Sequence, residues 1–260
     1  MPQISMMSHF NINDRDGIRT VQMNRGSSNP INEAFVNELI AIFERSRDDD
    51  SIKGILLTGQ PNFFSVGLDL PELYEHSPED FSRFWQCFMT LIYTLATFDK
   101  PFVTSITGHA PAGGCVMAIC ADYRVMAEGK YKIGLNEIPV GIIVPPSIYE
   151  LYALWLGRRA ASQYLLEGKL HTVQEALNIG LIDAVADLEQ VDDVAMQQLI
   201  KYTGFDQEAW RATKRNIRSN LTQYLIPKKD GHFEKAQKQW WKPEVRAALK
   251  SYIDQIKKKK

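Results

Sequence analysis

The alternation of apolar and polar residues predicts that strands and helices follow one another along the first half of the chain. Residues 18–23 (IRTVQM) alternate as a half-buried strand does, and the apolar runs 52–58 (IKGILLT) and 101–107 (PFVTSIT) predict buried strands. Helices are expected from the N-cap Asn32 to about Arg47 and over residues 79–97. Such an alternation favours an α/β fold with a parallel sheet and crossover helices.

The second half of the chain has a different pattern of residues, with small residues first, then mainly helical segments and a basic end. A turn rich in small residues, which includes Gly113 and Gly114, precedes an apolar helical run to Ala121. The following segments predict a short strand over 122–126 and helices over 149–156, 158–167 and 173–179. From Asp206 onward the period is helical, but the residues are more basic. We therefore expect a core over residues 1–200 and a C-terminal helical region over residues 201–260.

Composition and charge exclude several classes of protein. Hydrophobic residues make up 45% and charged residues 23% of the 260 positions, which is typical of a globular protein and not of a disordered one. Thirty basic and 31 acidic side chains argue against a polyanion-binding function for the chain as a whole. Residues 227–260, however, contain 11 Lys and Arg against 4 Asp and Glu, so the end of the chain is basic.

The cysteines and the N-terminal residues bear on metals and location. Cys87, Cys115 and Cys120 form no C-x-x-C pair, and five scattered histidines offer few ligands, so we expect free thiols and no metal site. No apolar run reaches the length of a membrane span. Residues 1–17 resemble neither a signal peptide nor a transit peptide, and the four terminal lysines are not a peroxisomal signal. A cytoplasmic location is expected.

Gly113 and Gly114 are the first candidate for chemistry. Glycines at the start of a helix leave backbone N–H groups uncovered, and these favour an anion or a developing negative charge. Alternatively, the two glycines only allow a tight turn. The pattern is neither G-x-G-x-x-G nor a Walker loop, so it does not support phosphate binding.

The segment 64–70 (FSVGLDL) is the second candidate, because it directly follows a predicted strand. Gly67 there can expose the N–H of Leu68. Ser65 lies outside any G-x-S-x-G elbow, so a nucleophilic role has no supporting motif, and a structural role for the loop stays open.

Glu137 is the third candidate. It lies in the apolar stretch 134–143 (GLNEIPVGII), where burial would raise the pKa of its carboxyl group towards the range of a general base. A surface glutamate on a loop is the alternative.

Taken in order, these segments resemble the enoyl-CoA hydratase/isomerase (crotonase) family over residues 18–185. The matching landmarks are GILLTG…FFSVGLDLPEL, KPFVTSITGHAPAGGCVMAICADYRVMAE, YKIGLNEIPVGIIVP and LEGKLHTVQEALNIGLIDAVA. Within that family, the PAGGC and GLNE…GII motifs resemble those of the monofunctional Δ3,Δ2-enoyl-CoA isomerases. The resemblance implies a spiral of ββα turns with C-terminal helices that form a homotrimer or a dimer of trimers.

The resemblance also implies roles for particular residues. The backbone N–H groups of Leu68 and Gly113 would hold the thioester oxygen, and Glu137 would be the acid/base. The substrate would contact Val66, Gly67, Leu68, Asp69, Leu70 and Gly113. Coenzyme A enters as part of the acyl-CoA substrate, and no separate cofactor is implied.

Val116 distinguishes between reactions. Hydratases of the family have a glutamate three residues after the oxyanion glycine, and this chain has valine there. Valine neither orients water nor carries a proton, so the resemblance favours a 1,3-proton shift by Glu137 from C2 to C4 of a 3-enoyl-CoA. Ile142, Ile143 and Val144 would exclude water. Asn136 either orients Glu137 or has a structural role.

Two further groups have open alternatives. Lys214, Arg215 and Arg218 either contact coenzyme A phosphates or lie on a solvated helix face. The aromatic residues at i, i+3, i+4 and i+7 either form a core stripe or line the acyl pocket; they are Phe81, Phe84, Trp85 and Phe88.

The sequence thus predicts an enoyl-CoA isomerase of unsaturated fatty-acid β-oxidation. Another acyl-CoA enzyme of the same family, a hydratase or a decarboxylase, is the alternative within enzymes. A non-enzymatic binder that contacts RNA or an acidic protein through its basic end is a third hypothesis, although no RNA-binding motif supports it, and neither nucleic-acid nor membrane binding is expected.

Overall fold

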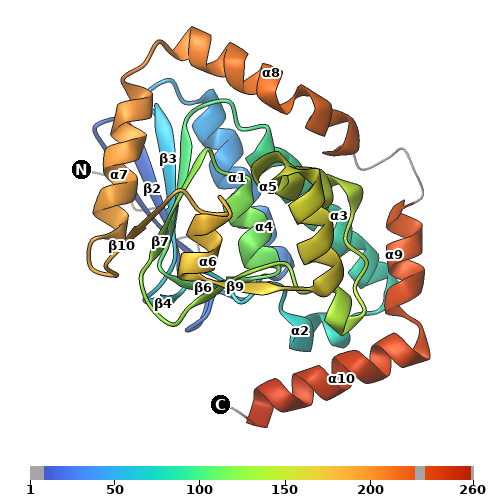
Figure 1. Ribbon diagram of the computed structural model, residues 1–260. Helices are drawn as coiled ribbons and strands as arrows, with labels where there is room; N and C mark the ends of the chain where they lie inside the picture. Colours follow the sequence, from blue (N-terminus) through green and yellow to red (C-terminus); the bar gives the residue numbers. More distant parts are fainter. Residues whose placement is uncertain (1–8, 226–231, 259–260) are drawn as a thin grey trace.

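The computed structural model describes residues 9–225 and 232–258 (Figure 1). The strands are β1 (Phe10–Arg15), β2 (Ile18–Met23), β3 (Gly54–Thr58), β4 (Asn62–Phe63), β5 (Phe102–Ile106), β6 (Gly108–Pro111), β7 (Tyr123–Ala127), β8 (Lys132–Gly134), β9 (Leu170–Thr172) and β10 (Ala184–Ala186). The helices are α1 (Glu33–Asp48), α2 (Leu70–Tyr74), α3 (Pro78–Ala96), α4 (Gly113–Ile119), the 3₁₀ turn η1 (Ile138–Val140), α5 (Pro146–Glu167), α6 (Val173–Asn178), α7 (Val191–Thr203), α8 (Gln207–Leu225), α9 (His232–Trp240) and α10 (Pro243–Lys258).

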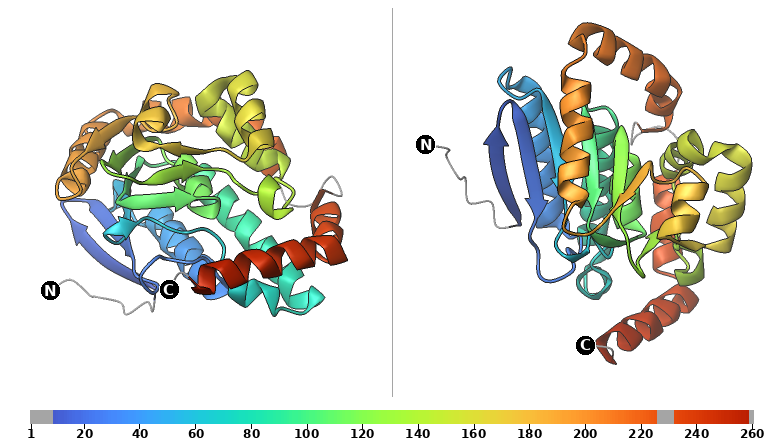
Figure 2. Two further views of the ribbon diagram at one scale, coloured as in Figure 1. Left: turned by 60° about the horizontal axis from the view of Figure 1, so that its bottom comes forward. Right: turned by 60° about the vertical axis from the view of Figure 1, so that its left-hand side comes forward.

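A large sheet forms the body of the molecule, with strand order β1-β2-β3-β5-β7-β10. Its strands are parallel from β2 to β10, and β1 pairs antiparallel with β2. In β3, Ile55 and Leu57 face the main core with α1 and α3, whereas Leu56 faces a smaller core under α7. Because both faces are covered, the strand is buried at every position, as in other parallel sheets, and its middle residues are apolar (Figures 1 and 2).

A small sheet lies beside the large one, with strand order β4-β6-β8-β9. Strand β6 runs parallel to both β4 and β8, and β9 runs antiparallel to β8. Gly108 in β6 permits this close pairing, since an added Cβ would lie 2.0 Å from the carbonyl carbon of Asn62. The carboxyl ends of β4, β6 and β8 therefore lie at the same edge.

The chain visits the two sheets in a repeating order. Strand β3 of the large sheet is followed by β4 of the small sheet and by α2 and α3; β5 is followed by β6 and α4; and β7 is followed by β8, η1 and α5. This succession confirms the expected α/β fold with crotonase-like strand–strand–helix turns.

Local signals in the sequence predicted most of the longer elements correctly. The strand over residues 18–23 is confirmed, and the Asn32 side chain accepts the Phe35 N–H at 3.0 Å as the N-cap of α1. The two helices expected around Gly157 form α5, in which Gly157 has a non-helical backbone (φ 74°, ψ 153°). The small sheet was not predicted, because β4 and β8 are too short to show a period.

The expected boundary at residue 200 falls inside α7, which continues to Thr203 and packs Leu199 under the large sheet. The helical C-terminal region is present as α8, α9 and α10. Residues 1–8, which belong to the N-terminal segment used for the location, and residues 226–231 and 259–260 lie outside the described residues.

Buried cations hold α8 against the core. Arg218 donates to the carbonyls of Ala96 (2.7 Å) and Cys120 (2.8 Å) and to Asp122 Oδ1 (2.9 Å). Lys214 donates to the Lys100 carbonyl and, at 2.6 Å, to Asp122 Oδ2. The solvated-face interpretation is therefore wrong for both cations, and their donors are engaged within the protein instead of being directed at a phosphate.

Loss of the Arg218 guanidinium should destabilise the fold strongly. Arg218→Met leaves carbonyls and one Asp122 oxygen without their donor, and breaking a buried charge pair typically costs about 3–5 kcal/mol. The exposed Arg215 on the same helix offers a matched control, because Arg215→Met should change the free energy of unfolding by less than about 0.5 kcal/mol. Urea unfolding of both variants measures the difference, and equal stabilities would contradict the anchoring role.

Candidate active site

The loop after β4 presents the N–H group of Leu68. Ile31 forms a parallel bridge to this residue: its N–H donates to the Gly67 carbonyl at 2.9 Å, and its carbonyl accepts the Asp69 N–H at 2.9 Å. Since both bonds use the neighbours of Leu68, its own N–H points away from Ile31. Within the described chain, that N–H has no acceptor.

A buried polar pair fixes this loop. The Ser65 hydroxyl donates to the Asn29 carbonyl at 2.7 Å and accepts the Gly67 N–H at 3.1 Å. The Asn29 amide donates to the Phe64 carbonyl at 3.0 Å. Ser65 and Asn29 are both fully buried, so Ser65 holds the loop in place and is not positioned as an exposed nucleophile. No pattern in the sequence indicated this role of Asn29.

Gly113 supplies the second N–H group. The preceding residue, Ala112, follows β6 with a positive φ of 47° and donates its N–H to the Gly134 carbonyl at 2.8 Å. This conformation turns the chain into α4 with the Gly113 N–H at its first position, where it has no acceptor in the described part of the protein. Gly114 satisfies a packing requirement as well, since an added Cβ would lie 2.4 Å from the Ser65 carbonyl oxygen.

The two N–H groups are neighbours. A Cβ added at Gly113 would lie 3.5 Å from the Leu68 nitrogen, and one added at Gly67 would lie 3.1 Å from the Gly113 nitrogen. Two adjacent free donors of this kind can stabilise an oxygen that gains negative charge, and one such donor is typically worth about 3 kcal/mol.

Glu137 follows β8 and immediately precedes η1. Its Oε2 atom is buried and, among the described residues, without a hydrogen-bond partner. Burial raises the pKa of this carboxyl group to about 7. The carboxylate also contributes, after burial, to the raised pKa of the Cys115 thiol, so it lies near the first turn of α4. An ordinary surface glutamate does not have these properties.

The residues around Glu137 differ in their roles. Val116, one turn into α4, is 1% exposed and belongs to the main core. Tyr152 of α5, which sequence reasoning missed, is fully buried; burial raises the pKa of its phenol, and the charges of Cys115 and Glu137 add to that rise. The Asn136 Oδ1 atom is buried without a partner in the described chain, which leaves its orienting role open.

The remaining residues of the expected substrate loop lie directly before α2 and at its first position. Asp69 caps α2 by accepting the Glu72 N–H at 3.2 Å, and it pairs with Arg25 at 2.7 Å. Val66 and Leu70 are half-buried. The Asp69 carboxylate is thus occupied within the protein, and contact of this loop with coenzyme A stays a prediction.

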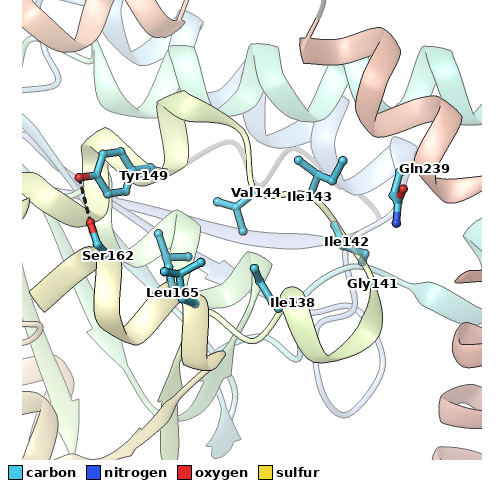
Figure 3. Close-up of a pocket in the computed structure, with 10 residues that line it drawn as sticks. Ile138, Gly141, Ile142, Ile143, Val144, Tyr149, Ser162, Leu165 and Gln239 are labelled. Atoms are coloured by element: carbon cyan, nitrogen blue, oxygen red, sulfur yellow. Dashed lines mark hydrogen bonds between the residues drawn. The ribbon is translucent and has the colours of Figure 1, made fainter.

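An apolar cavity of about 500 Å³ adjoins the Glu137 segment (Figure 3). The Ile142–Val144 segment forms one of its walls, and Tyr149 and Ser162 share a hydroxyl–hydroxyl hydrogen bond of 3.2 Å in its lining. The complete lining is Ile138, Gly141, Ile142, Ile143, Val144, Tyr149, Ser162, Leu165, Leu166 and Gln239.

The aromatic stripe of α3 belongs to the core, because all four of its residues are buried. Two of them, Phe81 and Trp85, also line a small cavity that includes Ile142 and Ile143. Contact of the stripe with an acyl chain stays a prediction.

Over residues 9–225 and 232–258, no group of three or more His, Cys, Asp or Glu side chains is arranged to hold a metal ion. A helix long and apolar enough to cross a membrane is also absent from these residues.

Comparison with known proteins identifies relatives along nearly the whole chain. The family model for enoyl-CoA hydratase/isomerase matches residues 13–259. Enoyl-CoA delta isomerase 1, mitochondrial, of Mus musculus is 32% identical over 94% of this chain and 85% of its own length. The crystal structure of human mitochondrial Δ3-Δ2-enoyl-CoA isomerase superposes with a TM-score of 0.94 at 29% identity, over 97% of this chain and 100% of that one. A 2,3-dehydroadipyl-CoA hydratase of Escherichia coli is 27% identical over 82% of this chain and 83% of its own length.

The buried Glu137 carboxyl should make the stability of the protein fall as pH rises. Its pKa is about 7 in the folded protein against 4.5 in the unfolded chain, so the folded state binds the proton more tightly between these values. Glu137→Gln should therefore gain stability over the wild type as pH rises from 4.5 to 8, by up to about 3 kcal/mol.

Denaturant unfolding at pH 5 and pH 8 measures this gain. The exposed Glu128 serves as a control, since Glu128→Gln should follow the wild-type pH dependence. Parallel curves for Glu137→Gln and the wild type would show that Glu137 is not held in an environment that disfavours its charge.

Proposed function

The chain belongs to the enoyl-CoA hydratase/isomerase family, and we propose that it is an enoyl-CoA isomerase that converts 3-enoyl-CoA into trans-2-enoyl-CoA in unsaturated fatty-acid β-oxidation. One observation carries the mechanism: Glu137, whose Oε2 atom is buried and whose pKa is about 7, follows β8, while two N–H groups without an acceptor in the described chain follow the neighbouring parallel strands β4 and β6.

The proposed reaction begins at C2. Glu137 takes a proton from C2 of the 3-enoyl thioester, and the electron pair left behind moves onto the thioester oxygen. Leu68 and Gly113 donate their N–H groups to that oxygen, so the negative charge of the dienolate develops against donors that are already in place. The protonated Glu137 then returns the proton to C4, and the double bond lies between C2 and C3.

The raised pKa suits both halves of this reaction. A carboxylate with a pKa of 4.5 would be a weaker base and would release the proton to water readily, whereas a group near 7 both accepts and returns a proton. The apolar cavity beside Ile138 and Val144 offers room for an acyl chain and excludes water from the dienolate.

Assembly is part of the proposal. We expect a homotrimer or a dimer of trimers, and an apolar groove of about 490 Å³ along α8 supports contact with a second copy. Phe205 and Ile217 are 47% and 59% exposed and lie in the same groove, and exposed apolar residues that gather in this way mark interaction sites. The cytoplasmic location and the absence of a cofactor other than the coenzyme A of the substrate stay predictions from the sequence.

Turnover of 3-enoyl-CoA esters tests the function, with the absorbance of the conjugated thioester as the measurement. The wild type should produce it, and Glu137→Gln should lower kcat by about 10²–10⁴-fold while saturated acyl-CoA still binds. Wild-type activity should decline below about pH 7 as Glu137 becomes protonated. Near-normal turnover in Glu137→Gln would refute the assignment of the base.

A hydratase remains the competing function, and Val116 decides between the two. Val116→Glu would place a second carboxyl on the first turn of α4 near Glu137, and the pKa values of such a pair separate into one ionised and one protonated group, as activation of water requires. We expect little hydration of trans-2-enoyl-CoA by the wild type and measurably more by this variant.

Val116→Gln is the matched control, because glutamine has nearly the same volume as glutamate and cannot ionise. It should destabilise the buried site comparably without gaining hydration activity. Brisk hydration by the wild type would overturn the argument, since catalysis would then need no second glutamate at position 116.

A further inference from the structure

The C-terminal helix α10 lies against two segments that are far apart in the sequence and both adjoin the site. It contacts α2, which begins directly after the Leu68 loop, and η1, which begins directly after Glu137. Figure 1 shows α10 crossing the end of the molecule below α2, and the left view of Figure 2 shows the same helix from below, in front of the molecule. Its inner face consists of Val245, Leu249 and Ile253, which are 6%, 0% and 3% exposed.

Val245 contacts the segment that carries the base. Gly141 ends η1 with a positive φ of 80°, and a Cβ added there would lie 3.3 Å from Val245 Cγ1. The same turn closes on Glu137, because the Ile142 N–H donates to the Glu137 carbonyl at 3.0 Å. Val245 therefore packs against the turn that fixes the Glu137 backbone.

Arg246, the next residue, contacts the segment that carries the oxyanion donor. Its Nη2 atom donates to the Tyr74 carbonyl at 2.7 Å, at the C-terminal end of α2, where a cation is favourable. Its guanidinium carbon lies 3.5 Å from the centre of the Tyr74 ring and 4.9 Å from that of Trp241. Arg246 thus joins α10 to α2 by a charged hydrogen bond and by stacking.

We propose that Arg246 is a positioning residue for the reaction, and that with Val245 it fixes the Leu68 loop and Glu137 relative to each other. This inference rests on the proposed isomerase function. A single carboxyl must reach both C2 and C4 while the thioester oxygen keeps its hydrogen bonds to the two N–H donors. Small displacements of either segment should therefore lower the rate of proton transfer strongly. A firmly held α10 also limits the access of water to the proton that Glu137 carries between the two carbons.

The fate of that proton distinguishes positioning from simple stability. In D₂O, a well-closed site returns the original proton from C2 to C4, whereas a loosened site exchanges it and places deuterium at C4. We expect Arg246→Met to lower kcat by tenfold or more, to change KM less, and to raise the deuterium content at C4. Arg246→Lys keeps the charge and should restore part of the wild-type behaviour.

Lys250 on the same helix provides the matched control, because it is exposed and pairs only with Asp254 among the described residues (3.2 Å). Lys250→Met should have wild-type kcat and deuterium content. Amide hydrogen exchange over α2 and residues 137–142 gives a readout that needs no turnover, and it should rise in Arg246→Met but not in Lys250→Met.

If folded Arg246→Met only melts at a lower temperature, with wild-type kcat, deuterium content and amide exchange, the inference is wrong. Should that variant not fold, Tyr74→Leu removes the stacking ring and keeps the carbonyl, and wild-type values in it would overturn the inference equally. Wild-type turnover of 3-enoyl-CoA tests the proposed function, and the ratio of the variant's kcat to that of the wild type tests the role of Arg246. The two proposals can therefore fail separately.

Discussion

The parallel pairing of β4, β6 and β8 is the constraint on which the site depends. Each strand ends at the same edge of the small sheet, and each is followed by one functional segment: the Leu68 loop, the Gly113 turn or Glu137. The strands contain only two to four residues, so their own hydrogen bonds supply little stability. Their register is imposed by close packing, as at Gly108, and by the large sheet to which every turn of the chain returns.

The site itself destabilises the fold in two places. Ala112 adopts a positive φ that costs a non-glycine residue about 1–3 kcal/mol, and Glu137 has a buried oxygen for which the described chain provides no partner. In the proposed reaction, Ala112 orients the Gly113 N–H towards the thioester oxygen, and Glu137 carries the proton. The extensive core around α1, α3 and the large sheet offsets these costs, and the buried bonds of Arg218 and Lys214 add to it. Strain is tolerated at the edge because the remainder of the molecule is well packed.

Sequence reasoning succeeded where the local pattern of residues determines the structure. The strand at residues 18–23 alternates, Asn32 can cap a helix, and a glutamate among apolar residues suggests a raised pKa, and all three are present in the structure. It failed where the information lies elsewhere in the chain. For Lys214 it considered a phosphate contact or a solvated helix face, and it missed the buried ion pair because the partner, Asp122, lies 92 residues away.

Backbone N–H donors are the hardest groups to predict from local sequence. The N–H groups of Leu68 and Gly113 have no side-chain signature, so only the resemblance to a family pointed to them. The structure shows why they are free: Ile31 uses the atoms on either side of Leu68, and Ala112 turns Gly113 to the start of a helix. Arg246 gave no signal at all, since a single arginine in a basic helix resembles its solvated neighbours until its contact with Tyr74 is seen.

The same fold can support addition of water or transfer of a proton, so the reaction is decided by the few groups around the substrate. Two N–H donors stabilise an enolate in either case. What differs is how many carboxyl groups can exchange protons with it and how much water reaches it. In this protein the first turn of α4 presents Val116, a fully apolar residue, where a second carboxyl would have to stand. Ile138, the residue after Glu137, lines an apolar cavity. The proposed proton transfer follows from this difference: a carboxyl with a pKa near 7, with no second carboxyl at position 116, is suited to return the proton it has taken to another carbon of the same substrate.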